Sequence, residues 1–257
     1  MIMSEKKPVI SVQNLTKSFD GRKVLDGVTI DINPSEIFVI LGGSGCGKST
    51  LLRHMTGAIQ PDSGKVFLFG KDLIPMNEDE KEKMKRRFGM SFQSSALLDY
   101  MNVEDNVSLP LREHTQLDPK IISIIVKMKL NLVGLHGFEN LMPSMLSGGM
   151  KKRVALARAI AMDPEIVFYD EPTAGLDPVV CAVVDKLIVD LSKKLLLTSV
   201  VVTHNMESVY RIADRVAMLH KGKVLEIGTP EQIRHSPNPI VQQFIKGEIE
   251  GPINYVE

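Results

Sequence analysis

A solid apolar run at residues 37–41 leads directly into a glycine-rich loop that ends in Lys, Ser and Thr. The run predicts a strand that is buried on both faces, and apolar residues at helical spacing after the loop predict a helix over residues 48–58. Between them the sequence fits G-x-x-x-x-G-K-[ST], a pattern in which backbone amides and a helix N-terminus surround phosphate groups. The predicted phosphate-binding residues are Gly42, Gly43, Ser44, Gly45, Cys46, Gly47, Lys48, Ser49 and Thr50.

The last side chains of this loop suit a nucleoside triphosphate and its metal ion. Lys48 adds a catalytically useful positive charge toward the outer phosphates, and the Ser49 hydroxyl is placed to bind Mg²⁺. An ordinary glycine-rich turn is the alternative. The strand before the loop and the helix after it are the context that phosphate binding requires, so we predict that the chain binds ATP with Mg²⁺.

Two carboxylates follow a second apolar run. Residues 166–169 lead straight into Asp170 and Glu171, and ligands of open α/β sheets bind at the carboxyl ends of strands. We expect Asp170 to hold Mg²⁺, directly or through water, and Glu171 to orient and activate the attacking water. Taken alone, the pair is better explained as two solvated carboxylates, but the phosphate loop upstream favours the catalytic interpretation.

Three further features suit the same chemistry. Gln93 and His204 each follow an apolar run. The Gln93 carboxamide is expected to reach the metal ion or its water, and the His204 imidazole the terminal phosphate. A structural or merely exposed histidine is the alternative for His204. A second glycine-rich loop opens a helix and can clamp another phosphate. Its residues are Leu146, Ser147, Gly148, Gly149 and Met150.

The order of apolar patterns predicts an α/β fold. Strand-like runs alternate with helical spacing, which favours a mainly parallel sheet wrapped by helices, and residues 94–162 are mostly helical in pattern. The predicted strands cover residues 9–15, 28–32, 37–41, 65–69, 88–92, 166–169, 199–203, 216–219 and 224–227. The predicted helices cover residues 48–58, 77–87, 103–111, 119–132, 178–194 and 206–213, with one more after Gly149.

Composition argues against several other classes of protein. The formal net charge is +0, so no nucleic-acid partner is indicated. No apolar stretch approaches the ~18 residues of a membrane span, and residues 1–8 lack the apolar run of a signal peptide. Two cysteines, Cys46 and Cys181, suggest no disulfide framework and a reducing, cytoplasmic compartment.

In this order the motifs resemble those of the ATP-binding subunits of ABC transporters, over roughly residues 9–250. The resemblance also implies that Phe19 stacks on adenine, for which a core phenylalanine is the alternative. The implied motifs are Walker A at residues 42–49, the Q-loop at Gln93, the signature at residues 146–150, Walker B at residues 166–170 with Glu171 as the catalytic carboxylate, the D-loop at Asp177 and the switch histidine His204.

The same resemblance implies one ABC-type ATPase domain across residues 1–257, built on a P-loop NTPase fold. Its RecA-like core would have a mainly parallel sheet with an N-terminal antiparallel β portion. An inserted α-helical subdomain would carry the signature loop. The implied ranges are 9–93 and 163–235 for the core, 94–162 for the helical subdomain and 236–257 for a C-terminal tail.

The family further implies partners for the chain. A head-to-tail homodimer would place each ATP between the Walker A motif of one subunit and residues 146–150 of the other. Integral membrane permease subunits would dock at a groove bordered by Gln93 and residues 97–101, although the two leucines of that run can instead pack inside the helical subdomain. The chain would then lie peripherally on the cytoplasmic face of the inner membrane.

Met150 departs from the glutamine that ends the signature in most of the family. With it, residues 146–159 resemble the branch associated with MCE proteins, which includes the Mla (MlaF-type) phospholipid-transport ATPases of Gram-negative envelopes. Neutral drift in another importer is the alternative. The branch implies phospholipid transport, an MCE-domain substrate-binding protein and a small accessory subunit.

The C-terminal segment carries a weaker signal. Residues 244–247 and 251–252 resemble the tail of the same branch, which reaches across to the other subunit. The polar and glycine-rich composition of residues 247–257 argues against a buried element of the same domain. Three other functions stay open at this point: an importer ATPase for amino acids or ions, a soluble non-transport ABC ATPase, and a small-molecule P-loop kinase.

Overall fold

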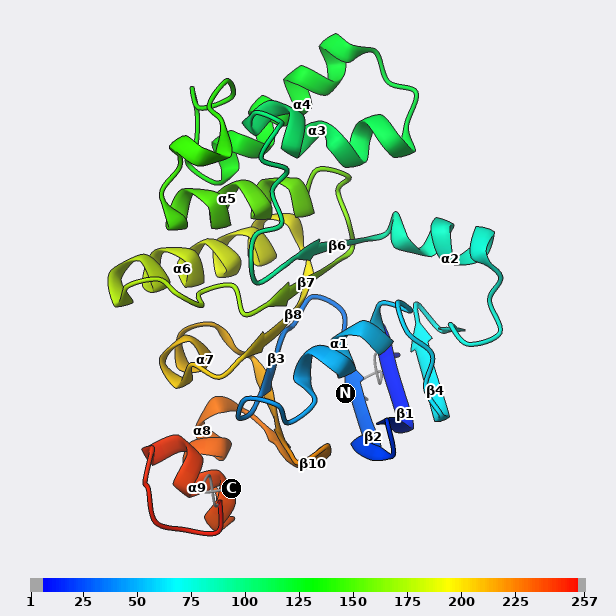
Figure 1. Ribbon diagram of the computed structural model, residues 1–257, viewed down its shortest axis with the longest axis vertical. Helices are drawn as coiled ribbons and strands as arrows, with labels where there is room; N and C mark the ends of the chain where they lie inside the picture. Colours follow the sequence, from blue (N-terminus) through cyan, green and yellow to red (C-terminus); the bar gives the residue numbers. More distant parts are fainter. Residues whose placement is uncertain (1–6, 254–257) are drawn as a thin grey trace, which may run out of the picture. The chain divides into compact units, whose positions relative to one another are not determined.

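The computed structural model describes residues 7–253, which form two compact units (Figure 1). The first unit joins the residues up to 77 with those from 202 onward, and the second unit comprises residues 78–201. Within residues 7–253, no helix combines the length and the apolar character needed to cross a bilayer.

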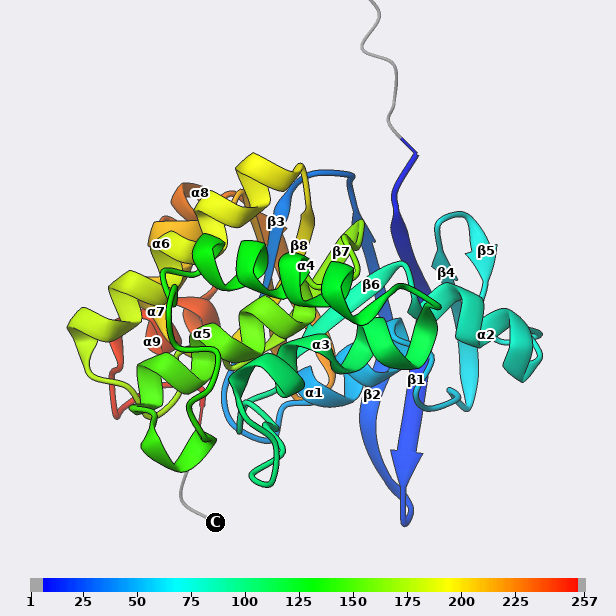
Figure 2. The same cartoon turned by 90° about the horizontal axis from the view of Figure 1, so that it is seen from above.

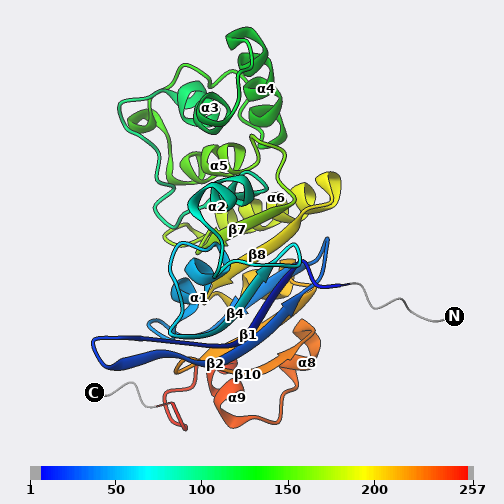
Figure 3. The same cartoon turned by 90° about the vertical axis from the view of Figure 1, so that its right-hand side faces the viewer.

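An antiparallel sheet opens the first unit, with strand order β2-β1-β4-β5. Figure 3 shows β1, β2 and β4 side by side, in agreement with their pairing. Buried and exposed residues alternate along the second half of β2, because successive side chains of a strand point to opposite faces. The four strands are β1 (Ile10–Phe19), β2 (Arg22–Ile32), β4 (Ser63–Leu68) and β5 (Lys71–Asp72).

A parallel strand pair positions the phosphate loop in the same unit. Strand β3 (Ile37–Leu41) pairs in parallel with β9 (Arg215–His220), and β10 (Lys223–Gly228) adds to β9 in the antiparallel sense. All five residues of β3 are buried, as the solid apolar run predicts. The helices of this unit are α1 (Lys48–Met55), α7 (Met206–Ile212), α8 (Pro230–Arg234) and α9 (Pro239–Lys246).

The second unit holds the other parallel pair and most of the helices. Strands β6 (Phe88–Ser91) and β7 (Ile166–Asp170) run in parallel. A Cβ at Gly89 would lie 1.9 Å from the Ala159 carbonyl oxygen, so only glycine allows α5 to approach β6 this closely. Figure 2 shows α3, α4 and α5 packed together. The helices are α2 (Glu78–Lys85), α3 (Val103–His114), α4 (Pro119–Leu132), the 3₁₀ helix η1 (Pro143–Met145), α5 (Gly148–Ala159) and α6 (Pro178–Leu195). Strand β8 (Thr198–Thr203), fully buried, contains the boundary between the units in the chain.

The mixed character expected of the fold is confirmed by these pairings. The sequence-based elements omit β5, the short 3₁₀ helix η1, and the α-helices α8 and α9. For the two helices the missing signals are present in the sequence: Thr229 caps α8 in a capping box with Gln232, and Asn238 caps α9. Each cap is followed by proline at the first helical position, which is a recognised start signal.

Residues 247–252 of the C-terminal segment are exposed, and the residue that follows them is buried. Ile253, placed in a stretch expected to lie outside the core, is only 5% exposed. The side chain of Gln243 on α9 accepts a hydrogen bond from the Ile253 N–H at 2.7 Å and donates one to its carbonyl at 3.1 Å. A buried amide that bonds to both backbone groups satisfies them without a partner strand, which allows Ile253 to be buried at the end of an exposed segment. Residues 254–257 of the predicted tail lie outside the described residues.

His54 on α1 makes the stability of the protein depend on pH. It is buried, its Nδ1 lies 3.1 Å from the Ile59 carbonyl, and its Nε2 has no partner in the described structure. Burial lowers its pKa from 6.5 to about 4, because the charged imidazolium loses its hydration.

We therefore expect the protein to lose stability as pH falls from 6.5 to 4. In this range the His54 side chain binds a proton in the unfolded chain but stays neutral in the folded protein. The free energy of unfolding therefore falls by up to about 3 kcal/mol. Calorimetric melting at several pH values measures the effect. His54→Gln should flatten this part of the profile, whereas His136→Gln, at an exposed site, should not. A profile that His54→Gln leaves unchanged would contradict the assignment.

Candidate functional site

The predicted phosphate loop connects β3 to α1 in the first unit and has a backbone that requires glycine. A Cβ at Gly42 would lie 2.2 Å from the Leu219 carbonyl oxygen. Gly47 has φ 107°, and a Cβ there would lie 2.8 Å from the Val24 carbonyl oxygen. Both positions exclude a side chain, so glycine is required where the loop packs against β9 and β2.

Lys48 is the first residue of α1 and is buried against this loop. Its ammonium donates hydrogen bonds to the carbonyls of Gly42 at 2.8 Å and Gly43 at 2.9 Å. No side chain caps the N-terminus of α1, since its N-cap residue is Gly47. A helix N-terminus with a lysine beside it is suited to bind phosphate, because amides, helix dipole and ammonium all attract an anion.

Two other predicted residues belong to the same unit. Phe19 ends β1 and is 45% exposed, so it is no core phenylalanine. The Lys17 ammonium lies 5.5 Å from the centre of its ring. His204 directly follows β8 and is exposed. Both side chains are accessible to a ligand.

The predicted acidic pair ends β7 in the second unit. Asp170 is the last residue of the strand, and Glu171 is buried immediately after it. The backbone of Glu171 has φ 47°, in the left-handed region that non-glycine residues rarely adopt, at a cost of about 1–3 kcal/mol. Its carbonyl accepts hydrogen bonds from the Ala174 N–H at 3.2 Å and the Lys152 ammonium at 3.3 Å. Strain held by such contacts is typical of functional residues.

The second glycine-rich loop also has little room for side chains. Ser147 is the N-cap of α5 and accepts a hydrogen bond from the Met150 N–H at 3.3 Å. A Cβ at Gly149 would lie 2.6 Å from Cγ1 of Val180. Leu146 is buried, whereas the residues that follow are at least partly exposed. The loop thus combines an anchored leucine with an accessible helix N-terminus.

Asp177 has a structural contact that its predicted place in a D-loop did not anticipate. It is the N-cap of α6, and its carboxylate accepts hydrogen bonds from the N–H groups of Val179 and Val180, each at 3.0 Å. An N-cap of this kind stabilises a helix by about 1 kcal/mol. The residue therefore shapes the start of α6, whatever else it contacts.

Lys152 is a residue of the site that the sequence patterns do not reveal. It lies on α5, is 6% exposed, and its ammonium donates to the carbonyls of Gln93 and Glu171. Charged residues next to glycine-rich loops are usually solvated, so helical spacing alone gave no reason to single it out. The signal available was its place one turn before Leu156 on the buried face of the helix.

Comparison with known proteins decides the family. The ABC transporter model matches residues 25–174, more than half of the chain. The chain belongs to the ABC transporter family. This ABC ATPase is 43% identical over 247 residues to the intermembrane phospholipid transport ATP-binding protein MlaF of Haemophilus influenzae, covering 96% of this chain and 94% of that protein. It is 41% identical to a probable ribonucleotide transport ATP-binding protein of Mycobacterium leprae, covering 96% of this chain and 72% of that protein.

Solved structures agree with the predicted fold. A dimeric ATP-binding cassette with ADP and phosphate bound matches at a TM-score of 0.79 and 29% identity, over 86% of this chain and 98% of that one. A subunit of the cbiONQ ABC transporter complex from Clostridium perfringens matches at a TM-score of 0.83 and 29% identity, over 95% of both chains. The predicted P-loop NTPase fold and the ABC ATPase class are confirmed.

The donor chemistry of this ABC ATPase fits a magnesium ion. Ser49 offers a hydroxyl oxygen in the first unit, and Gln93 and Asp170 offer a carboxamide oxygen and a carboxylate in the second. Each is a hard oxygen donor of the kind that Mg²⁺ prefers, together with phosphate and water. Within the described residues there is no cluster of three or more His, Cys, Asp or Glu side chains for a metal ion.

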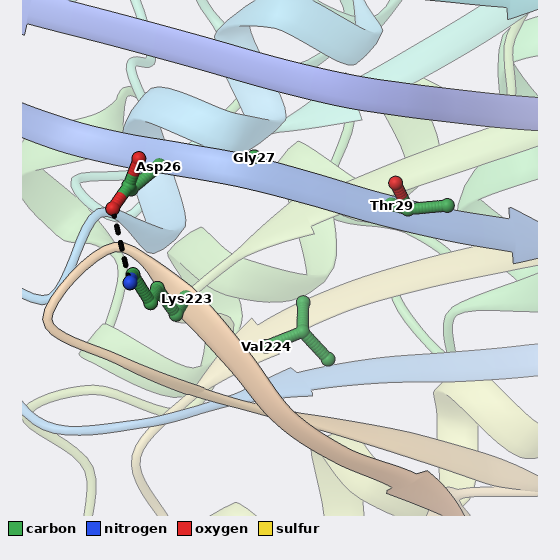
Figure 4. Close-up of a pocket in the computed structure, with 5 residues that line it drawn as sticks. All are labelled: Asp26, Gly27, Thr29, Lys223 and Val224. Atoms are coloured by element: carbon green, nitrogen blue, oxygen red, sulfur yellow. Dashed lines mark ion pairs between the residues drawn. The ribbon is translucent and has the colours of Figure 1, made fainter.

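The first unit also has a hollow of about 370 Å³ that none of the predicted site residues lines. Figure 4 shows it between β2 and β10, with Lys223 and Asp26 forming an ion pair of 3.2 Å at its edge. The lining residues are Asp26, Gly27, Thr29, Lys223 and Val224. None of them has a predicted role, and exposed ion pairs of this kind contribute little to stability.

Proposed function

We propose that this ABC ATPase hydrolyses ATP to drive phospholipid transport across a Gram-negative envelope through a separate membrane permease. The observation that carries ATP binding is the phosphate loop, in which the buried Lys48 ammonium contacts two loop carbonyls and no side chain fits at Gly42. The phospholipid assignment is supported by the 43% identity to MlaF across nearly the full length of both chains.

The contacts to adenine and to the phosphates fall to the first unit in this proposal. The exposed ring of Phe19 stacks on adenine, because the flat face of a phenyl ring can pack against the flat face of the base. Lys48 pairs with the outer phosphates, and the backbone amides around them supply further donors. The Ser49 hydroxyl holds Mg²⁺, with Asp170 and Gln93 as its other protein ligands.

Hydrolysis is assigned to Glu171 together with His204. Water attacks the γ-phosphorus as the bond to the leaving ADP oxygen breaks, and the water proton passes to the Glu171 carboxylate. When bound, Mg²⁺ neutralises the charge of the phosphate oxygens. His204 donates a hydrogen bond to the terminal phosphate, which its exposed position after β8 permits.

We propose a head-to-tail homodimer as the working form. The partly exposed loop from Ser147 to Met150 would contact the ATP held by the other subunit. Asp177, at the start of α6, would belong to the same interface. This is supported by the dimeric cassettes among the similar structures. Val179 and Val183, 74% and 51% exposed on α6, offer apolar surface for such a contact.

Exposed apolar residues in the second unit support further protein partners. Tyr100 is 76% exposed, while Leu97 and Leu98 are half-buried, so this run combines internal packing with an accessible tyrosine for a permease helix. An apolar stripe on and before α4 offers a second surface, suited to an accessory subunit. It consists of Leu117, Ile121, Ile124 and Met128. An MCE-domain protein would join through the permease, which places this subunit on the cytoplasmic face of the inner membrane.

A ribonucleotide transporter is the second candidate, because of the mycobacterial relative. This chain spans 72% of that protein against 94% of MlaF from Haemophilus influenzae. The fuller match favours phospholipid. The small-molecule kinase leaves the signature loop without a role, and it is not favoured by the family match.

The test first measures ATP binding and hydrolysis, and then identifies the polypeptides and lipids that copurify with the protein. Calorimetry with millimolar Mg-ATP is expected to register binding, and the bound nucleotide is expected to be hydrolysed to ADP and phosphate without transfer to added metabolites. Copurification from the native membrane is expected to yield permease polypeptides and phospholipid. Folded protein without a heat of binding would remove the ATPase assignment, and copurified nucleotide-binding partners without phospholipid would favour the second candidate.

A further inference from the structure

The Lys152 ammonium joins three functional segments of the second unit. Lys152 lies in the first turns of α5, the helix that the signature loop opens. Its ammonium donates to the carbonyl of Gln93, which follows β6, and to the carbonyl of Glu171, which follows β7, the latter at 3.3 Å. Signature, Q-loop and catalytic carboxylate are thereby connected through one side chain.

Stability alone does not explain why this ammonium is buried, because removing a charge from water costs free energy. The side chain is 6% exposed, whereas its neighbours Lys151 and Arg153 are half-buried. Burial lowers the pKa of Lys152, and the nearby charges of Glu171 and Asp170 oppose that effect. Replacing a buried charge with a well-packed apolar side chain is often neutral or stabilising, so a purely structural account favours methionine or leucine at this position.

The contact with Glu171 falls on a strained residue. Glu171 holds φ 47°, and the direction of its carboxylate depends on that backbone conformation. Its carbonyl is held by two donors, the Ala174 N–H and the Lys152 ammonium. Because Ser147 caps α5 and Lys152 lies just beyond, displacement of the signature loop moves the ammonium as part of the same rigid helix.

We propose that Lys152 is a positioning residue that couples the signature loop to the backbone of Gln93 and Glu171. Contact of the signature with a phosphate group shifts or steadies α5, and the Lys152 ammonium holds Glu171 in the conformation that activates water. This inference rests on the proposed ATPase function and adds a route by which the signature loop regulates hydrolysis.

The experiment compares three variants of the full chain. Lys152→Met keeps the length and removes the donor, and Lys152→Arg keeps a cation. Lys151→Met removes the adjacent charge, whose side chain forms no hydrogen bond or ion pair among the described residues. We expect Lys152→Met to lower kcat at least about tenfold, with the Kd of Mg-ATP changed less than about threefold, since small displacements of reacting groups cost this much. Lys152→Arg should retain more activity than Lys152→Met, and Lys151→Met should match the parent.

A double-mutant cycle separates positioning from general destabilisation. In a Glu171→Gln background, Lys152→Met should reduce the residual hydrolysis less than about twofold, because a residue that acts through Glu171 loses its effect with it. Losses that multiply in the double variant, or a weaker Kd with unchanged kcat, would overturn the inference. Parent protein that fails to bind Mg-ATP would instead remove the proposed function, so the two failures are distinguishable.

Discussion

Glu171→Gln is expected to lower kcat for ATP hydrolysis by about 10²–10⁴, while Mg-ATP still binds with a Kd within a few-fold of the parent. The carboxamide has the same shape as the carboxylate but cannot accept the proton of the attacking water. Glu171 lies directly after the Asp170 carboxylate at the end of β7 and is buried, so the substitution changes one acceptor without exposing the core. Phosphate release and nucleotide binding, measured on the same preparation, give kcat and Kd.

A closed dimer with bound nucleotide should accumulate in this variant, because in the proposed homodimer hydrolysis removes the γ-phosphate contact between the subunits. The matched control is Glu165→Gln, at the other end of β7. Its exposed carboxylate pairs with Arg87 at 2.7 Å, a contact worth little on the surface, so kcat should stay near the parent value. An unchanged rate in Glu171→Gln would show that another group activates the water.

Lys48→Met is expected to weaken Mg-ATP binding at least about 100-fold, since a charge-assisted hydrogen bond contributes roughly 1.5–3 kcal/mol and this ammonium is placed to make more than one. The side chain is buried beside the loop, so solvent cannot replace it. The loss of its bonds to Gly42 and Gly43 should also lower the melting temperature modestly. Calorimetric titration and thermal unfolding measure the two effects separately.

The control for this charge is Lys65→Met on β4. Lys65 is exposed and its side chain has no partner in the described residues, so ATP affinity and melting temperature should both match the parent. Equal affinity in the parent and in Lys48→Met would mean that the loop does not hold the triphosphate. A folded variant is required for this conclusion, and the melting curve supplies that test.

Local sequence signals predicted most elements of the fold because they act over short distances. The helix expected at residues 119–132 matches α4 at both ends, since Asp118 caps it and Pro119 occupies its first position. The strand expected at residues 37–41 matches β3, because every side chain of the run is apolar. Strand β1 extends to Phe19 beyond the expected end, as its pairing with β2 stabilises residues of weaker pattern.

Predictions for the candidate site divide in the same way. The glycines of the phosphate loop could be predicted, because the spacing of the motif is itself what phosphate binding requires. The exposure of Phe19 does not, because an aromatic side chain at a strand end is equally compatible with a core. Lys152 shows the largest difference between expectation and structure. A lysine in a polar run is expected in solvent, whereas this one is buried and donates hydrogen bonds to two carbonyls.

The order and spacing of residues along this chain were enough to predict a phosphate loop, an acidic pair and the ABC ATPase class, because the motifs behind these predictions are short segments whose chemistry resides in consecutive residues. Tertiary structure alone decided the burial of Lys152, the strained backbone of Glu171 and the capture of Ile253 by Gln243. These features depend on contacts between residues distant in the chain, where burial and hydrogen-bond partners are supplied by other elements rather than by neighbours in sequence.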